Sequence, residues 1–543
     1  MLTSHPFSLF KPVFFNAKPE WFWAKWFLTL LLVFLFFLLT IQNAPKLHSD
    51  EFMTLELGRI VLDPTTSWSI AWLTDRAESV FFWSYIGPVM QEMSYQAVGQ
   101  IGPRVSAIIG GLLASTILVG WLVARKTSPG IAFLLGLVFL LDPLFVQGYT
   151  MGRVDGWAIG LSLCACLILR NAINKPPVTG FINRPLLLAG AFAALAFFIW
   201  PSAIFIFPLI ILEFFYLAKT YKVTDKKRAV LHITQFALGG LIMGVLILLP
   251  IATLLYTQFE KVIEGFTVNT RFGAKWGEKP EGLALFASSL EILRVLKFTP
   301  FLFLFGLLAL IMRQQTGLLI ACLFAAFLML STLVYLQRVQ YLLPYFITSI
   351  AVFSQIEIAN SKLRKLFKPL VIITLLIWPL SLSLGVRTAL ALDNESERDR
   401  HLVFDAARSM IGQGKHMVYI PYEFYYSGRS LGWQMYKPYL AFGDTLSTDA
   451  LKKVLPHVDY VIMYEWEVQK SFDEQLKKDG LEDRGTFYIY KDATGKSDIT
   501  KTTNISRIRN LYSIFRKPYG PYKLYVRRYS STTSSQNRKL FYR

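Results

Sequence analysis

The feature that most constrains this chain is a series of apolar segments long enough to cross a membrane. The hydrocarbon core of a bilayer is about 30 Å thick, and a helix of roughly 20 apolar residues spans it. The sequence contains about eleven such segments: 22–42, 104–124, 129–147, 155–173, 185–200, 201–218, 229–256, 299–313, 317–335, 341–358 and 369–388. They predict an α-helical multi-pass membrane protein with about 11 transmembrane helices.

Two of these segments allow a second interpretation. The fifth and sixth share the hinge FIWPSAIF at 198–205, which is either a tight turn between two spans or a kink within one. The first segment follows several lysines, as a signal peptide does. It is too long for the apolar region of a signal peptide, and LLTIQNAPK is a poor cleavage site, so we expect a membrane anchor.

The charges of the connecting loops predict the orientation in the membrane. With the N-terminus in the cytoplasm, the Lys/Arg-rich connections all fall on the cytoplasmic side: 124–126, 170–184, 219–228, Arg313 and 362–368. The opposite side carries 43–103, 257–298 and everything after 388. Short basic loops stay in the cytoplasm. We therefore expect a plasma (inner) membrane protein whose long loops and C-terminal domain are periplasmic or otherwise extracytoplasmic.

After residue 388 the composition becomes polar and the pattern changes. Helices are predicted at 397–414, 448–458 and 468–480, and strands at 415–421, 459–465 and 486–492. Alternating strands and helices indicate a small α/β domain. We therefore divide the chain into an N-terminus, a transmembrane region, an α/β domain and a basic tail, at 1–21, 22–390, 391–495 and 496–543.

The tail from 496 to 543 holds twelve Lys/Arg and one Asp, a net +11 of the chain's +20. One interpretation is a solvated tail that ends in a strand at 519–528. The other is attraction to anionic lipid headgroups or to an anionic polymer. Nucleic acid is not an expected partner for a tail outside the cytoplasm.

Carboxylates gather at the extracytoplasmic ends of the predicted spans. Asp50 and Glu51 follow the first span, Asp142 ends the third, and Asp155 opens the fourth two residues after Arg153. Ionisable groups at this depth are unfavourable unless they face a cavity or a partner. The same side supplies three further cations and an aromatic residue: Arg271, Lys275, Arg338 and Tyr341.

Each of these residues also has a plainer interpretation. Asp50 and Asp155 could cap the helices that follow them, where a carboxylate accepts from unpaired N–H groups. Asp142 precedes a proline and could be a turn residue, and Glu51 could lie on a solvated helix face. Arg271 and Lys275 could be ordinary loop charges. Interfacial anchoring would explain Arg338 and Tyr341.

His48 and the three cysteines do not indicate a metal site. A single histidine beside acids is a weak metal signal. Cys164, Cys166 and Cys322 all lie within apolar segments, so we expect small core residues and no disulfide framework.

The acids and their setting resemble those of the glycosyltransferase C superfamily. Asp50–Glu51 just outside the first span resembles the Asp-Glu motif of the protein O-mannosyltransferase-like family, and GRVDGWAIGL at 152–161 resembles an Arg-x-Asp element of bacterial members such as the lipid A aminoarabinose transferase. The long outer loop with FFWSYIGPVMQEMSYQAVGQIGPRVSAIIGG at 81–111 agrees with this. RVQYLLPY at 338–345 is similar to the family's RYLLPxxP stretch, with Gln340 in place of an arginine.

The resemblance, over about residues 20 to 390, implies transfer of a sugar from a polyprenyl-phosphate donor to a lipid, glycan or protein acceptor on the extracytoplasmic face, with inversion of the anomeric centre. It implies Asp50 as general base. Glu51 or Asp155 would orient the acceptor, and Asp50 and Asp155 are the candidates to hold a divalent cation such as Mg²⁺ or Mn²⁺. The candidates to bind the donor phosphate are Arg153, Arg271, Lys275, Arg338 and Tyr341.

Two other functions compete with this hypothesis. A lipid or sugar transporter or flippase would carry polar or helix-breaking positions near the bilayer midplane, often in repeated halves. Here the acids gather at one face and no halves repeat. A non-catalytic scaffold would tolerate neutralisation of Asp50.

Overall fold

The structure, a computed structural model, describes residues 19–41, 49–63, 84–174, 183–220, 226–257, 295–312, 315–330, 336–354, 371, 374–392, 399–436, 455–468, 470–489 and 519–528. The chain divides into two compact units. The first comprises Met1–Gln42, Met53–Leu62 and Ser79–Ala389, and the second comprises Asn43–Phe52, Asp63–Glu78 and Leu390–Arg543.

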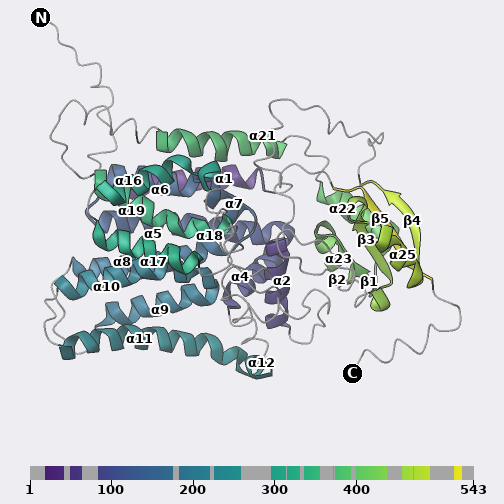
Figure 1. The fold of residues 1–543 in the computed structure, drawn as a ribbon, viewed down its shortest axis with the longest axis horizontal. Helices are drawn as coiled ribbons and strands as arrows, with labels where there is room; N and C mark the ends of the chain where they lie inside the picture. The colour runs from purple at the N-terminus through teal and green to yellow at the C-terminus, as the bar shows by residue number, and fades with distance from the viewer. Residues whose placement is uncertain are drawn as a thin grey trace, which may run out of the picture. The chain divides into compact units, whose positions relative to one another are not determined.

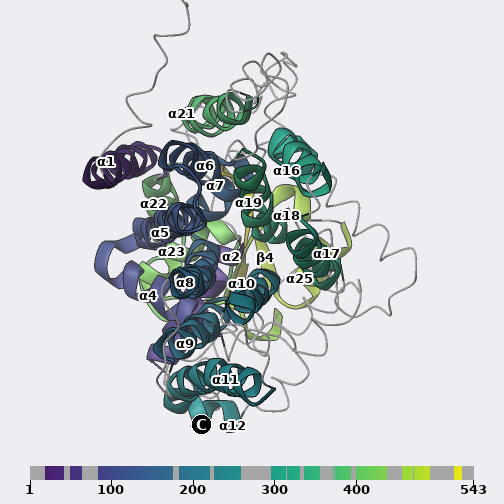
Figure 2. The ribbon, with the colours of Figure 1, turned by 90° about the vertical axis from the view of Figure 1, so that its left-hand side faces the viewer.

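The first unit is helical, and each of the predicted apolar segments contains a helix. Its α-helices are α1 (Pro19–Leu38), α4 (Ile86–Val98), α5 (Gly102–Ala124), α6 (Pro129–Leu141), α7 (Pro143–Thr150), α8 (Asp155–Ile173), α9 (Arg184–Ile199), α10 (Phe207–Thr220), α11 (Lys226–Leu248), α12 (Ala252–Thr257), α15 (Val295–Phe298), α16 (Pro300–Met312), α17 (Thr316–Leu330), α18 (Leu336–Val339) and α19 (Leu343–Ser354). Figure 1 shows the long helices side by side, and Figure 2 shows them end-on as a bundle.

Shorter elements connect these helices. The 3-10 turns are η2 (Gly99–Ile101), η3 (Pro201–Ile206), η4 (Leu249–Ile251) and η5 (Gln340–Leu342). The last apolar segment contains a π-helical stretch, η6 (Leu380–Val386), followed by α21 (Arg387–Leu392). The boundary between the two units falls within helix α2 (Ser49–Leu62). Its first turn belongs to the second unit and the rest of the helix belongs to the first.

Five described helices are long and apolar enough to cross a membrane, or six if the bent pair α6 and α7 forms one span. The bend of 55° falls at Asp142. Four shorter apolar helices accompany them, α9 among them. The hinge at 198–205 separates two helices, because Trp200 has an extended backbone (φ −155°, ψ 125°) that ends α9. Both α9 and α10 then pack against α8.

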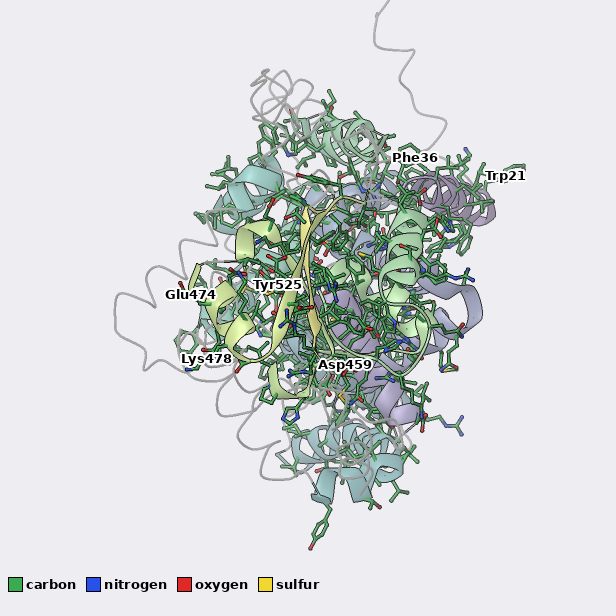
Figure 3. All side chains as sticks on the ribbon, turned by 90° about the vertical axis from the view of Figure 1, so that its right-hand side faces the viewer. Trp21, Phe36, Asp459, Glu474, Lys478 and Tyr525 are labelled. Carbon is green, nitrogen blue, oxygen red and sulfur yellow. The ribbon has the colours of Figure 1, made fainter. Side chains whose placement is uncertain are left out.

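Helix α1 is apolar on both its buried and its exposed faces. Its buried face is formed by Phe22, Trp26, Leu30, Val33 and Phe37. The opposite face exposes Leu28, Leu31, Leu32 and Leu35, together with Trp21, which projects outward in Figure 3. A helix that is apolar all round is suited to lipid rather than to water. The packing of this helix therefore agrees with a membrane-spanning role.

Close contact between α5 and α8 depends on small residues. Gly156 and Gly160, four residues apart on α8, lie against Gly110–Gly111 and Ala114 of α5. A Cβ at Gly156 would lie 2.6 Å from the backbone nitrogen of Gly111. Small residues at this spacing let two helix backbones approach each other within a membrane. This contact fixes the start of α8, which is where Asp155 lies.

The second unit contains a small α/β domain. Its five-stranded sheet has the order β2-β1-β3-β5-β4, formed by β1 (Met417–Tyr419), β2 (Gln434–Tyr436), β3 (Tyr460–Tyr464), β4 (Leu481–Phe487) and β5 (Tyr522–Arg527). The strands β2, β1 and β3 are parallel, and β5 runs antiparallel to both β3 and β4. The helical elements are α22 (Arg400–Met410), η8 (Tyr422–Phe424), α23 (Tyr425–Leu431), η9 (Leu455–His457), η10 (Glu465–Glu467) and α25 (Lys470–Lys478).

The helices predicted at 397–414 and 468–480 and the strands predicted at 415–421 and 459–465 are confirmed, whereas most of the helix predicted at 448–458 lies outside the described residues. The strand predicted at 486–492 is placed too late, because β4 occupies Leu481–Phe487 and pairs with β5. The strand predicted at 519–528 contains β5, which lies inside the sheet between β3 and β4. Figure 3 shows Asp459 and Tyr525 among the strands, and Glu474 and Lys478 on the side of α25 that faces away from them.

Candidate functional site

A buried ion pair lies at the start of α8. The Arg153 Nε donates to Asp155 Oδ2 at 2.6 Å, and both side chains are almost completely buried. The Arg153 guanidinium also lies 5.9 Å from the ring centroid of Trp200, at the end of α9. A carboxylate and an aromatic ring therefore fix the plane of this guanidinium.

Tyr341 completes the group from a distant part of the chain. Its hydroxyl donates to Asp155 Oδ1 at 2.7 Å, and its side chain is fully buried. Three residues predicted for the site, Arg153, Asp155 and Tyr341, therefore meet. Interfacial anchoring of Tyr341 is wrong, because an anchor would be partly exposed. Capping by Asp155 is also wrong, since Val154 occupies the cap position and Asp155 accepts from side chains.

The turn that carries Arg153 is held by neighbouring helices. Gln91 of α4 donates through Nε2 to the carbonyl of Gly152 at 3.0 Å. The backbone N–H of Arg153 donates to the Gly148 carbonyl at 3.4 Å. Gly152 has φ +72°, a backbone conformation that residues other than glycine disfavour. Helix α4 and the end of α7 thus set the position of Arg153.

Gln340 lies beside this group and is fully buried. Both polar atoms of its amide have no hydrogen-bond partner among the residues that the structure describes. Its Oε1 would lie 2.7 Å from a Cβ placed on Gly148, so the glycine leaves the space that the amide occupies. Arg338, also predicted for this site, is half-buried two residues earlier on α18, which packs against α7.

The remaining predicted residues have different outcomes. Asp142 is the N-terminal cap of α7, where it accepts from the N–H groups of Leu144 and Phe145 at 3.0 and 3.3 Å; its predicted alternative was a turn residue, and capping was not predicted for it. Asp50 lies in the first turn of α2, but its side chain is outside the described part of the chain. Arg271 and Lys275 also lie outside the described residues.

Glu51 is held within the second unit. Its side chain is fully buried and accepts a hydrogen bond from the Tyr426 hydroxyl at 2.8 Å. The interpretation of Glu51 as a solvated helix face is therefore wrong. Tyr426 was not predicted as a functional residue, although it lies in the tyrosine-rich stretch YEFYYSGRS at 422–430.

The side chain of Asp155 is poorly suited to hold a divalent cation. One of its oxygens accepts from a guanidinium and the other from a phenol, so a metal would have to displace a hydrogen-bond donor beside a positive charge. Within the described ranges, no three His, Cys, Asp or Glu residues gather in a metal-binding arrangement.

A second charge cluster lies at the other end of α8, around the buried side chain of Glu213, a residue that was not predicted from the sequence. Glu213 of α10 forms ion pairs with Arg125 and with Arg170, the latter at 2.6 Å, and accepts from Trp121 Nε1 at 3.1 Å. Arg170 is fifteen residues after Asp155, about 22 Å along the helix axis. The sequence did contain a signal for this cluster, because Glu213 is an isolated acid in the apolar stretch FPLIILEFFYLAKT.

Comparison with known proteins identifies the fold. No protein-family model matches this sequence, and no curated protein matches it. Among solved structures, ArnT from Cupriavidus metallidurans bound to undecaprenyl phosphate aligns with a TM-score of 0.55 and 12% identity, over 86% of this chain and 97% of ArnT. The arabinofuranosyltransferase AftD from Mycobacteria aligns with a TM-score of 0.52 and 13% identity, over 95% of this chain but 40% of AftD.

The chain shares a fold with ArnT and AftD. This is the fold that the resemblance to the glycosyltransferase C superfamily implied, and the predicted multi-pass helical architecture with a small α/β domain is thereby confirmed. The alignment with ArnT covers a larger share of this chain than the helical unit comprises, so residues of both units take part in it.

Proposed function

We propose that this protein is an integral membrane glycosyltransferase that transfers a sugar from a polyprenyl-phosphate donor to an acceptor on the extracytoplasmic face. The observation that carries the proposal is the buried group of Arg153, Asp155 and Tyr341, on a fold shared with a protein crystallised with undecaprenyl phosphate. We place the protein in the inner membrane with its α/β domain in the periplasm, as the loop charges indicate.

In this proposal the reaction is a single displacement that inverts the anomeric centre. The acceptor oxygen forms a bond to the anomeric carbon while the bond from that carbon to the phosphate oxygen breaks. Asp50 accepts the acceptor's proton as general base. The sugar leaves the donor, and polyprenyl phosphate departs with a growing negative charge.

Arg153 would stabilise that charge on the phosphate. Arginine carries five N–H donors in a planar fork, so an arginine oriented through Nε can still bind a phosphate. Asp155 and Tyr341 would act by orienting Arg153, which differs from the acceptor-orienting role that the resemblance implied for Asp155. Preorganised cations of this kind contribute most where charge develops in the transition state. Arg271, Lys275 and Arg338 remain further candidates for the same phosphate.

The test is sugar transfer in membranes that contain equal amounts of the wild-type protein, Asp50→Asn or Asp142→Asn. Radiolabelled polyprenyl-phosphate sugars would be offered with native lipid extract and glycan or peptide acceptors. Asp142→Asn is the matched control, because asparagine also caps helices well and Asp142 acts as a cap.

We expect transfer by the wild type and by Asp142→Asn, and loss of transfer in Asp50→Asn. Equal transfer by Asp50→Asn would remove Asp50 from the chemistry. No transfer from any donor, together with movement of labelled lipid between leaflets, would replace the proposal with a lipid transporter.

A further inference from the structure

The N-terminal turn of α2 belongs to the same compact unit as the C-terminal α/β domain. The segment Asn43–Phe52, which carries the Asp50–Glu51 pair, groups with Leu390–Arg543. Helix α2 itself runs without a break from Ser49 to Leu62. The α/β domain therefore holds the turn that carries the proposed catalytic base.

Two kinds of contact hold this turn. The Tyr426 hydroxyl on α23 donates to Glu51 Oε1 at 2.8 Å, and both side chains are buried. Next to Glu51, the ring of Phe52 lies with its centroid 4.8 Å from that of Tyr422 and 5.4 Å from that of Tyr425. Three tyrosines of the domain thus contact two consecutive residues of α2.

Tyr426 is itself fixed by its surroundings. The Arg400 guanidinium lies 5.4 Å from its ring centroid, and the Tyr425 ring packs edge-on at 5.4 Å. Helix α22, which carries Arg400, packs against both α23 and η8. Burial raises the pKa of the neighbouring Tyr422 phenol, so this phenol stays neutral at physiological pH. The Tyr426 hydroxyl that donates to Glu51 is therefore held in a fixed position.

The position of Glu51 determines that of Asp50. The two residues are adjacent in one helical turn, so a fixed Glu51 sets the rotation of the helix and the backbone position of Asp50. The first turn of a helix lacks part of its internal hydrogen bonding and frays unless something holds it. The Tyr426 hydroxyl and the rings of Tyr422 and Tyr425 supply that restraint.

We propose that Tyr426 is a positioning residue for catalysis, acting through Glu51 to hold Asp50 in place. Glu51 is then an attachment point for the α/β domain and not a group that contacts the acceptor. The inference rests on the proposed function, since it takes Asp50 as the general base. It assigns the C-terminal domain a direct part in the reaction.

The experiment uses the full-length protein in membranes and compares Tyr426→Phe with Tyr525→Phe. Tyr525 is the matched control, because its hydroxyl also donates to a carboxylate, Asp473 Oδ1 at 2.9 Å, within the same domain. We expect Tyr426→Phe to lower kcat about 10-fold with an unchanged KM for the donor. Tyr525→Phe should retain the wild-type kcat.

Two substitutions of Glu51 sharpen the test. Glu51→Gln keeps an oxygen that accepts the Tyr426 hydroxyl, so it should retain most of kcat, whereas Glu51→Met should lose as much as Tyr426→Phe. A second readout does not depend on activity. It is the rate at which maleimide labels the Asp50→Cys variant, and we expect this rate to rise several-fold when Tyr426→Phe is added. Protein without the Asp50→Cys substitution gives the background labelling, because Cys164 is partly exposed while Cys166 and Cys322 are buried.

These outcomes separate the inference from the proposed function. Wild-type transfer that Tyr426→Phe leaves unchanged, with unchanged maleimide labelling of the Asp50→Cys variant, would overturn the inference while the proposed function stands. Collapse of transfer in Glu51→Gln together with a normal Tyr426→Phe would also overturn it, since Glu51 would then act chemically. Absence of transfer by the wild type would refute the proposed function and with it the catalytic role of Tyr426, whatever the labelling shows about the contact.

Discussion

Tyr341→Phe is the sharpest perturbation of the group at the start of α8. The substitution removes one hydroxyl, and that hydroxyl donates to Asp155 Oδ1 at 2.7 Å. Both side chains are buried, so water does not replace the lost donor easily. A hydrogen bond to a charged group contributes about 1.5–3 kcal/mol. We expect the free energy of unfolding to fall by an amount in this range.

The effect on transfer follows from the proposed role of Asp155. If the Tyr341 hydroxyl keeps Asp155 aligned with Arg153, its loss misplaces the guanidinium that stabilises the leaving phosphate. A loss of about 1.5–3 kcal/mol expressed in the transition state corresponds to a roughly 10- to 150-fold lower kcat. Asp155→Asn is a blunter variant, because it leaves Arg153 buried without its counter-charge and costs about 3–5 kcal/mol of stability.

The assay pairs thermal unfolding of the detergent-solubilised protein with kcat and KM for the donor. Tyr345→Phe is the matched control: Tyr345 is also fully buried, one turn later, and its hydroxyl donates to the Phe205 carbonyl at 2.8 Å. We expect Tyr345→Phe to lose about 0.5–1.5 kcal/mol of stability, as for a neutral bond, with little change in kcat. Equal losses of kcat in both variants would refute the reasoning, because the effect would then come from packing.

Three further predictions concern separate parts of the molecule. Glu213→Gln should destabilise the protein by about 3–5 kcal/mol in thermal unfolding, since two arginines lose their shared carboxylate, while transfer per folded molecule stays normal. Gln340→Met should raise the melting temperature, because it removes a buried amide whose missing hydrogen bonds cost about 1–3 kcal/mol of stability. It should also lower transfer if that amide binds substrate. A lower melting temperature would show that the amide is paired. The hydrogen bond from Lys477 lowers the pKa of Asp473 from its ordinary value. The stabilisation is therefore fully present above that ordinary value and is lost as the pH falls through the lowered pKa. Lys477→Met should weaken hydrogen-exchange protection of α25 slightly at pH 7 in low salt, and not in acid strong enough to protonate Asp473.

The apolar segments and the neighbouring pair of Arg153 and Asp155 were predictable because each signal is local in sequence. Span length is set by the bilayer, and a charge pair two residues apart at the start of a span is unfavourable there without partners. The partner of Asp155 was not predictable as such, since Tyr341 lies 186 residues away and only tertiary packing brings it close. The partner of Glu51 lies 375 residues away.

The misplaced strand has a similar physical cause. The sequence favoured 486–492 because its aromatic and β-branched residues have high strand propensity. The sheet instead pairs Leu481 with Arg527, buries Leu481 in the core and accommodates a register shift between Asp483 and Thr486. Gly485, at φ +96°, permits this irregularity. Tertiary pairing thus overrides local propensity at an edge strand.

Gln340 stands where the RYLLPxxP stretch, which residues 338–345 resemble, carries an arginine. An arginine at this position would bring a second positive charge close to the start of α8, whereas an amide offers hydrogen bonds without charge. The charge that pairs with Asp155 comes instead from Arg153, which Asp155, Trp200 and the turn at Gly152 hold in place. Because a preorganised cation stabilises a leaving phosphate only where its geometry is fixed, we expect Arg153→Lys, which keeps the charge and loses the planar fork, to lower kcat more than Gln340→Met does.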